Sequence, residues 1–194
     1  MSQLTSVCVY CGSSGQVADI YKIAAHDLGT RIAQAGLRLV YGGGRVGLMG
    51  IMADAALAAG GEVVGIIPEH IQAREVDHTG LTELHVVDSM HTRKRLMVEK
   101  SDAFVILPGG LGTMDEAFEI ITWRQLELHD KPVVIANIDG FWEPLRALLD
   151  HIRHTGFGRG DIDRLYSFVP SVDAILPALR RLPDPTVPVD SLHL

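Results

Sequence analysis

The sequence predicts an α/β fold of the doubly wound, Rossmann-like kind, in which helices cover both faces of a mostly parallel sheet in a single domain. Short apolar runs alternate with longer amphipathic or alanine-rich segments, and glycine-marked turns separate them. Uninterrupted apolar runs are typical of parallel strands that are buried on both faces. The chain has 194 residues, of which 47% are hydrophobic and 21% are charged, which suits one well-buried domain and is short for two.

Each expected element follows from this rhythm in chain order. The expected strands are the short apolar runs Ser6–Tyr10, Leu37–Tyr41, Val63–Ile67, Leu84–Val87, Ala103–Leu107 and Pro132–Ala136. The expected helices are the amphipathic or alanine-rich segments Val17–Ala35, Leu48–Ala59, Met90–Lys100, Thr113–Leu128, Phe141–His151 and Val172–Leu182. Beyond Leu182 the chain is rich in proline and has little to bury. We therefore expect a folded domain over residues 1–182 and a flexible C-terminal tail over residues 183–194.

Charge and composition limit the partners of this chain. A formal net charge of −7 argues against a nucleic-acid partner, which would need a basic face. The first six residues contain no basic region ahead of an apolar one, and the apolar stretch from Val46 to Ile67 is interrupted by Asp54 and Glu62. We therefore expect a cytoplasmic protein that handles a small molecule and does not enter a membrane.

The two cysteines, Cys8 and Cys11, form a C-x-x-C pair and raise the question of a metal or redox site. A structural zinc site would need a second pair of ligands, and a thioredoxin-type motif opens a helix, whereas these cysteines flank the end of a strand. The nine histidines do not have the spacing of metal ligands. We therefore expect no metal.

Three glycine loops follow three of the expected strands: Cys11-Gly12-Ser13-Ser14, Tyr41-Gly42-Gly43-Gly44 and Pro108-Gly109-Gly110. The carboxyl ends of parallel strands share one edge of a sheet, and open α/β sheets bind ligands there. One glycine pair alone is most simply a tight turn, but three loops at one edge predict a common ligand site. The string Gly42-x-Gly44-x-x-Gly47 also matches the dinucleotide fingerprint. Its place after the second strand, not the first, disfavours a dehydrogenase.

The third loop is the most informative of the three. The run Ala103–Leu107 leads into P-G-G-L-G-T-M-D-E over residues 108–116, a strand, a glycine turn and a helix start that present backbone N–H groups to an anion. We therefore expect a phosphate site, in which a carboxylate at Glu116 would weaken binding unless it performs chemistry. Thr113 and Glu116 also fit a capping box, which would hold that carboxylate at the mouth of the loop. The two interpretations are compatible.

A cluster of cations lies on the expected helix that starts at Met90, in the order Met90-His91-Thr92-Arg93-Lys94-Arg95. Such a cluster is usually a solvated face. This helix, however, starts at the carboxyl end of a strand, so one or two of the cations can reach the ligand. The planar fork of Arg93 suits a carboxylate or phosphate oxygen better than Lys94 does.

Together these motifs resemble the Lonely Guy family of cytokinin riboside 5′-monophosphate phosphoribohydrolases. The similarity runs from about Val7 to about Ala178, and the Arg93-Lys94 pair and the P-G-G-x-G-T-x-x-E motif are its most specific parts. Proteins of this kind have often been labelled lysine decarboxylases. Nothing in the sequence supplies the pyridoxal-phosphate apparatus that a decarboxylase would require.

The resemblance implies hydrolysis of the N-glycosidic bond of AMP or N6-substituted AMP, which gives the free base and ribose 5-phosphate without any cofactor. It implies that Arg93 and Glu116 are the catalytic pair, and the sequence leaves open whether Arg93 holds Glu116, the ribose or the phosphate. From the loops and the resemblance together, the expected substrate-binding residues are Gly12, Ser13, Gly43, Gly44, Glu75, Met90, Lys94, Gly109, Gly110, Leu111, Gly112, Thr113 and Thr122.

The same resemblance implies a homodimer whose sites lie near the subunit boundary. Apolar side chains on the helices expected from Met90 and from Thr113, more than one sheet face requires, are consistent with it. The alternative from another functional class is a protein that binds a nucleotide or a molybdenum cofactor without turnover. The presence of both Arg93 and Glu116 disfavours that alternative.

Overall fold

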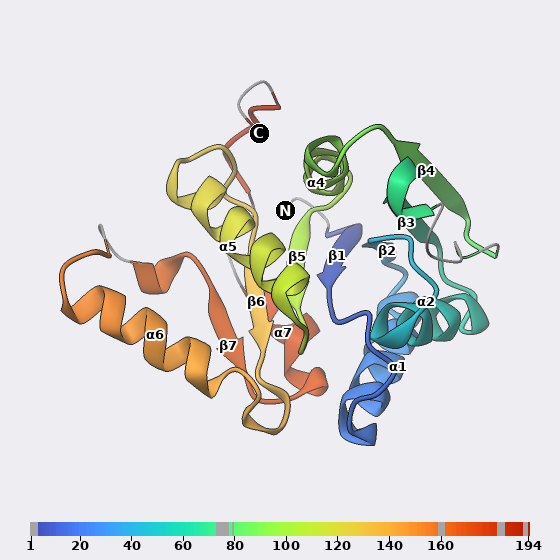
Figure 1. Ribbon diagram of the computed structural model, residues 1–194, viewed down its shortest axis with the longest axis horizontal. Helices are drawn as coiled ribbons and strands as arrows, with labels where there is room; N and C mark the ends of the chain where they lie inside the picture. Colours follow the sequence, from blue (N-terminus) through green and yellow to red (C-terminus); the bar gives the residue numbers. More distant parts are fainter. Residues whose placement is uncertain (1–3, 73–77, 79, 159–161, 182–184, 192–193) are drawn as a thin grey trace.

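A computed structural model describes residues 4–72, 78, 80–158, 162–181, 185–191 and 194 (Figure 1). The strands of this part of the chain form one sheet in the order β4-β3-β2-β1-β5-β6-β7, and every neighbouring pair is parallel. The strands are β1 (Ser6–Tyr10), β2 (Arg38–Tyr41), β3 (Val63–Pro68), β4 (Glu83–Val87), β5 (Ala103–Ile106), β6 (Val133–Ala136) and β7 (Ser167–Val169). The predicted parallel sheet is thereby confirmed.

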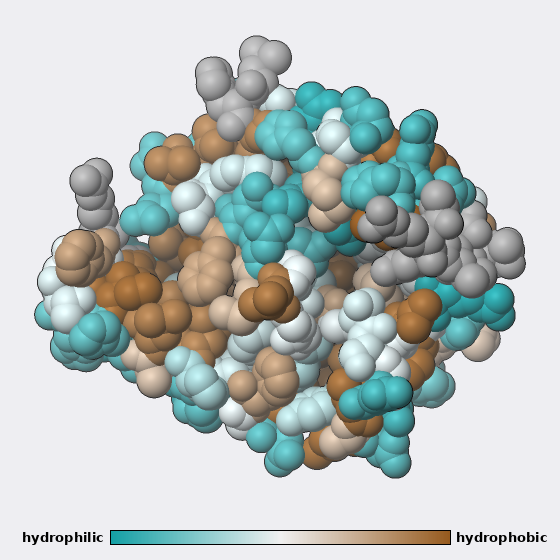
Figure 2. All heavy atoms as spheres, viewed as in Figure 1, coloured by the Kyte–Doolittle hydropathy of each residue, from teal (hydrophilic) through white to brown (hydrophobic). Residues whose placement is uncertain are grey.

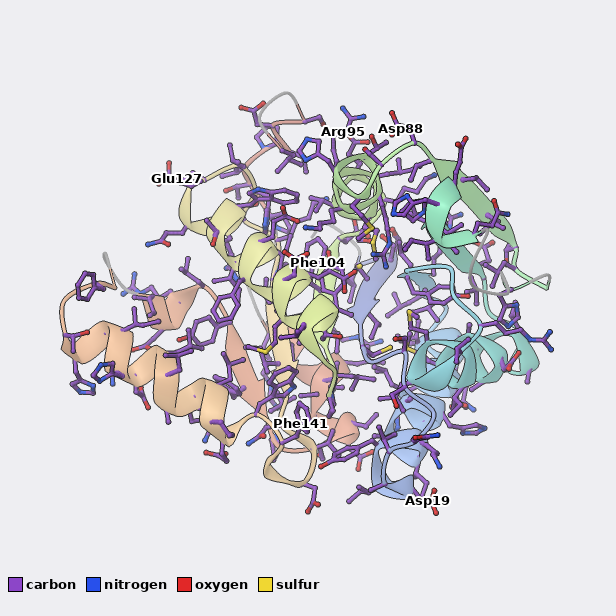
Figure 3. The ribbon with its side chains drawn as sticks, viewed as in Figure 1. Asp19, Asp88, Arg95, Phe104, Glu127 and Phe141 are labelled. Carbon is purple, nitrogen blue, oxygen red and sulfur yellow. The ribbon has the colours of Figure 1, made fainter. Side chains whose placement is uncertain are left out.

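Helices cover both faces of the sheet because alternate residues of each strand point to opposite sides. On β1, Val7 and Val9 belong to the apolar cluster under α1 (Asp19–Gln34), α2 (Gly47–Ala58) and α7 (Ile175–Arg181). Cys8 and Tyr10 belong to the opposite cluster, under α4 (Met90–Glu99), α5 (Leu111–Gln125) and α6 (Glu143–His154). Phe104 of β5, near the centre of Figure 3, is fully buried in that second cluster. The chain is therefore doubly wound.

The sequence-based predictions missed the shortest elements, and several predicted helix boundaries are shifted by one to three residues. The three-residue strand β7 and the four-residue helix α3 (Glu69–Gln72) were not predicted, because neither is long enough to show a periodic pattern. Helix α5 starts at Leu111, two residues before the predicted start. The segment from Val172 is a 3₁₀ turn followed by α7, because Pro177 has no N–H to continue an α-helix back to Asp173.

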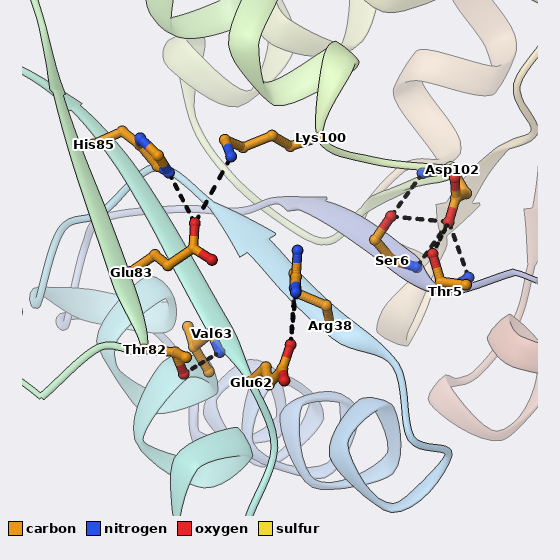
Figure 4. Close-up of polar contacts among 10 residues, drawn as sticks. All are labelled: Thr5, Ser6, Arg38, Glu62, Val63, Thr82, Glu83, His85, Lys100 and Asp102. Atoms are coloured by element: carbon orange, nitrogen blue, oxygen red, sulfur yellow. Dashed lines mark hydrogen bonds and ion pairs between the residues drawn. The ribbon is translucent and has the colours of Figure 1, made fainter.

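At the amino ends of the strands, polar side chains tie neighbouring segments together (Figure 4). Oδ2 of Asp102 accepts hydrogen bonds from both the backbone N–H and the hydroxyl of Thr5 and of Ser6, at 2.7 to 2.9 Å. Arg38 forms an ion pair with Glu62 at 2.9 Å. These residues border a cavity of about 650 Å³, which lies at the edge of the sheet opposite to the glycine loops.

The described residues of the C-terminal segment form no helix, as predicted, yet they contact the domain. Oδ2 of Asp130 accepts hydrogen bonds from the backbone N–H groups of Thr186 and Val187, and Leu194 is 5% exposed within the cluster under α4, α5 and α6. The sequence did not indicate these contacts. Flexibility of the tail stays a prediction.

Among the helices that the structure describes, none is both long enough and apolar enough to cross a membrane.

Candidate active site

Three loops meet where the order of the strands changes direction. β1 and β5 are neighbours in the sheet, and the chain continues from them to opposite edges, which is the point where open α/β sheets bind ligands. The N–H of Gly12, after β1, donates to the carbonyl of Pro108, after β5, at 3.1 Å, and the N–H of Leu48 donates to the carbonyl of Gly12 at 3.0 Å. The backbone therefore gathers the predicted loops at one edge.

A cavity of about 250 Å³ opens at this junction. Its lining comes from all three loops, from α2 and α3, from the first turn of α4 and from the first two turns of α5. The lining residues are Cys11, Gly12, Ser13, Gly42, Met49, Ile71, Met90, Arg93, Gly110, Leu111, Gly112, Thr113 and Glu116. Glycines make up much of one wall, so backbone groups are accessible there. Arg93 and Glu116 supply the charge.

The start of α5 forms the glycine wall of the cavity. Gly110 is its N-cap residue, in an extended conformation, and no side chain caps the helix. The predicted capping box is therefore wrong, because the helix begins at Leu111 and places Glu116 in its second turn. The N–H groups of the first turn have no acceptor within a helix and carry its positive dipole end, which suits them to an anion.

Arg93 and Glu116 form a buried ion pair across the floor of the cavity. Nη1 of Arg93 lies 3.0 Å from Oε1 of Glu116, and their side chains are 12% and 9% exposed. Nε of Arg93 donates to the carbonyl of Ile66, at the end of β3, at 3.2 Å. Helix α4 starts at Met90 because the hydroxyl of Ser89 accepts from the N–H of Thr92, and this start aims Arg93 at α5. Of the roles that the sequence left open for Arg93, the structure shows the contact with Glu116.

Burial raises the pKa of Glu116 above its usual value of 4.5, and the neighbouring Arg93 opposes that rise. Two acidic neighbours, Asp115 and Glu119, raise this pKa further, while Lys94 lowers it. A carboxyl group whose pKa is moved toward neutrality exchanges protons more effectively in catalysis. Its burial and raised pKa make Glu116 chemically suited to proton transfer.

Lys94 points away from the cavity, toward α5. Its Nζ lies 2.7 Å from Oδ2 of Asp115 and 3.0 Å from Oε2 of Glu119, and its side chain is 12% exposed. Two carboxylates therefore already neutralise its ammonium group. Substrate binding by Lys94 stays a prediction.

The structure brings most, but not all, of the expected site residues together. Three of the expected glycines lie in the loops without lining the cavity: Gly43, Gly44 and Gly109. Thr122 is exposed near the C-terminal end of α5 and does not line the cavity either. Glu75 lies outside the described residues. The sequence reasoning missed Cys11, Gly42, Met49 and Ile71 as lining residues, although Cys11 and Gly42 stand in the loops that it singled out.

The two cysteines are free and buried, and burial raises the pKa of both thiols well above the usual value. A raised pKa disfavours the thiolate, which is the reactive form of cysteine.

The sequence is similar to a well-defined group of proteins. A family model described as "Possible lysine decarboxylase" matches residues 49–179. A cytokinin riboside 5′-monophosphate phosphoribohydrolase of Rhodococcoides fascians is 52% identical over 153 residues, which are 78% of this chain and 77% of that protein. A probable enzyme of the same name from Oryza sativa subsp. japonica is 42% identical over 193 residues, which are 100% of this chain and 78% of that protein.

The chain belongs to the Lonely Guy family. The Lonely Guy resemblance inferred from the motifs is thereby confirmed over nearly the whole chain. A similar protein in Arabidopsis thaliana, also named a cytokinin riboside 5′-monophosphate phosphoribohydrolase, is 43% identical over 80% of this chain and 73% of its own length.

Solved structures extend the likeness of this Lonely Guy chain at the level of the fold. The molybdenum cofactor binding protein of Rippkaea orientalis superposes with a TM-score of 0.70, over 93% of this chain and 98% of that chain, at 22% identity. The molybdenum cofactor carrier protein of Chlamydomonas reinhardtii gives a TM-score of 0.69 at 21% identity, over 92% of this chain and 98% of that chain. These similarities confirm the Rossmann-like architecture and carry no argument about the ligand.

Proposed function

We propose that this protein hydrolyses the N-glycosidic bond of adenine-type nucleoside 5′-monophosphates, AMP or N6-substituted AMP, and releases the free base and ribose 5-phosphate. The observation that carries the proposal is the buried Arg93–Glu116 pair in a cavity whose wall is the start of α5. Relatives named for this reaction, up to 52% identical to this chain, support it.

The geometry suggests how the substrate is oriented. The 5′-phosphate binds at Gly110, Gly112 and Thr113, where the first-turn N–H groups of α5 and its dipole favour an anion. The ribose then lies over Glu116, in the second turn of the same helix. The base extends toward the half of the cavity that Met49, Ile71 and Met90 make more apolar.

In the proposed reaction, the bond between C1′ and the base nitrogen breaks and its electron pair leaves with the base. The positive charge that develops on the sugar is stabilised by the carboxylate of Glu116. Glu116 also orients a water molecule and takes its proton as the water oxygen bonds to C1′. The departing base takes a proton from solvent, and Glu116 returns its proton to solvent, so one water molecule is consumed and the carboxylate is restored. These steps use side chains of this chain and need no cofactor.

Arg93 acts on Glu116 in this proposal. Its guanidinium lowers the pKa of Glu116 and so opposes the rise that burial causes, and the contact with Ile66 fixes the direction of the guanidinium. The guanidinium group of Arg93 contacts Glu116 through Nη1, and in this proposal its Nη2 donates to a substrate oxygen. Arg93→Lys would keep the charge and lose this fork.

We further propose that the protein works as a homodimer. Figure 2 shows hydrophobic residues gathered over α5 and α6, and large apolar side chains remain exposed on or beside these helices. Leu126 is 63% exposed, Leu148 44% and Phe157 83%. Exposed apolar patches on a domain this small commonly mark an interface. Light scattering coupled to size-exclusion chromatography tests the proposal, and a monomer at micromolar concentration would refute it.

The test of the proposed function is base release. AMP, an N6-alkyl AMP, GMP and CMP are incubated with the protein, and the products are separated by chromatography. We expect adenine or the N6-alkyl adenine together with ribose 5-phosphate, and far less base from GMP or CMP. A well-folded protein that binds AMP and releases no base from any of them would refute hydrolysis and favour a carrier. A cytoplasmic location and the lack of nucleic-acid partners stay predictions.

A further inference from the structure

Gly42 is the lining residue whose lack of a side chain matters most for the charged pair. It follows β2, and its φ does not lie in the left-handed region, unlike that of Gly43 or Gly47, at +78° and +67°. Its backbone conformation is therefore open to any residue. What excludes a side chain at Gly42 is the space that it would need.

That space is occupied by Arg93. A Cβ on Gly42 would overlap Nη2 of Arg93 and would lie 3.3 Å from its Cζ. The third neighbour, Sδ of Met49, would be in ordinary contact at 3.4 Å. No backbone atom stands among these three neighbours. At Gly47, by contrast, a Cβ would overlap the backbone of Ser13.

Two other contacts of Arg93 fix the position of its guanidinium group. Nε is held by the carbonyl of Ile66 at 3.2 Å, and Nη1 is held by Glu116 at 3.0 Å. A methyl group at position 42 would push the guanidinium off the end of β2, and both contacts would lengthen or break. The atom in the way, Nη2, is at the end of the Arg93 side chain, which can move without any change in the backbone. The fold can therefore accommodate a methyl group at position 42, but the ion pair between Arg93 and Glu116 would be disturbed.

We propose that Gly42 is a positioning residue, which has no side chain so that the guanidinium of Arg93 can lie across the end of β2 and reach Ile66 and Glu116 together. The test of this inference by enzyme kinetics rests on the proposed function. The test by thermal stability depends only on the folded structure. Gly42 acts through Arg93.

The test is a double-variant cycle built from Gly42→Ala, Arg93→Ala and the combination of both. We expect Gly42→Ala to lower kcat for AMP by about 10- to 100-fold, since misplacing a catalytic group by about 1 Å costs about that much. In the Arg93→Ala background the same change should alter kcat by less than about twofold, because the group that it displaces is gone. Gly15→Ala is the matched control, because a Cβ at Gly15 would meet nothing within 4 Å, and it should keep wild-type activity.

A pH profile separates positioning from general damage. The charges that act on the pKa of Glu116 are those of Arg93 and Lys94 from α4 and of Asp115 and Glu119 from α5. On the side of β1, the charge of Glu116 itself raises the pKa of Cys8, of Tyr10 and of Cys11, which follows the strand. The methyl group carries no charge, so it can change the pKa of Glu116 only by moving Arg93. The acid limb of kcat/KM should therefore move to higher pH in Gly42→Ala and stay in place in Gly15→Ala.

Thermal melts keep the two proposals separable. If wild-type protein releases no base, the proposed function fails, and the inference is still tested by the melts. Gly42→Ala should then lower the melting temperature in the wild-type background and leave it unchanged or raise it in Arg93→Ala. If Gly42→Ala alone does not fold, folding of the double variant supports the inference and failure of both refutes it. Equal effects of Gly42→Ala in the two backgrounds, on kcat or on melting, would also overturn it.

Discussion

Acid should destabilise this protein through His129, which anchors helix α5. His129 is 0% exposed, its Nε2–H donates to the carbonyl of Ile120 on α5 at 3.0 Å, and its Nδ1 accepts from the N–H of Lys131 at 3.1 Å. Both ring nitrogens are therefore satisfied only in the neutral form. A proton on Nδ1 would face the N–H of Lys131 inside an apolar cluster.

The size of the effect follows from the pKa. Burial lowers the pKa of His129 from 6.5 to about 4, and the cations of Lys131 and Arg124 act in the same direction. The unfolded chain therefore binds the proton first, so stability is complete above pH 6.5 and is lost as the pH falls toward 4. At 1.36 kcal/mol per pKa unit, the free energy of unfolding should fall by about 3 kcal/mol between pH 7 and pH 4 from this group alone.

Urea unfolding at pH 7, 6, 5 and 4, followed by tryptophan fluorescence, measures this contribution. His129→Gln removes the titration, so the wild type should lose about 3 kcal/mol more than the variant over this range. His151→Gln is the control, because His151 is exposed on α6 and its change should leave the wild-type pH dependence intact. Parallel pH dependences of wild type and His129→Gln, within about 0.5 kcal/mol, would refute the reasoning.

Three further predictions concern the site and the sheet. Glu116→Gln should lower base release by about 100-fold or more and lower the melting temperature, since it leaves the buried guanidinium of Arg93 without its carboxylate partner; wild-type turnover in a folded variant would contradict the mechanism. Adenosine should be a poorer substrate than AMP by about 100-fold or more in kcat/KM if the start of α5 binds the phosphate, and equal efficiencies in the same chromatographic assay would place the phosphate elsewhere. Asp102→Ala should cost about 2 kcal/mol in urea unfolding at pH 7, because Thr5 and Ser6 lose a shared acceptor. The pKa of Asp102 is lowered, so the cost should vanish as the pH falls below its usual value of 3.8, and a cost that persists there would argue against the charge as its origin.

The sequence by itself determined the architecture and the edge at which the site lies. Uninterrupted apolar runs such as Ala103–Ile106 predict strands that are buried on both faces. Glycines that directly follow several strands indicate the carboxyl edge of the sheet, even when the order of the strands is not known. The motif around Glu116 likewise indicated which helix begins beside the cavity, and phosphate binding there stays a prediction. Such signals come from residues that are close together along the chain, so they can be recognised in the sequence alone.

Only the tertiary structure decided which side chains meet. Whether Arg93 or Lys94 faces the cavity depends on the rotation of α4 over β3, which positions Nε of Arg93 on the carbonyl of Ile66 and Lys94 on α5. The capping box failed for a similar reason, since the helix start was set by the extended backbone at Gly110 and not by Thr113. Gly42 is the clearest example of what the sequence does not reveal. The nearby glycines Gly43 and Gly47 have a positive φ, whereas a side chain at Gly42 is excluded by the guanidinium of Arg93, 51 positions further along the chain. Contacts between residues so far apart are fixed by packing, and no local pattern records them.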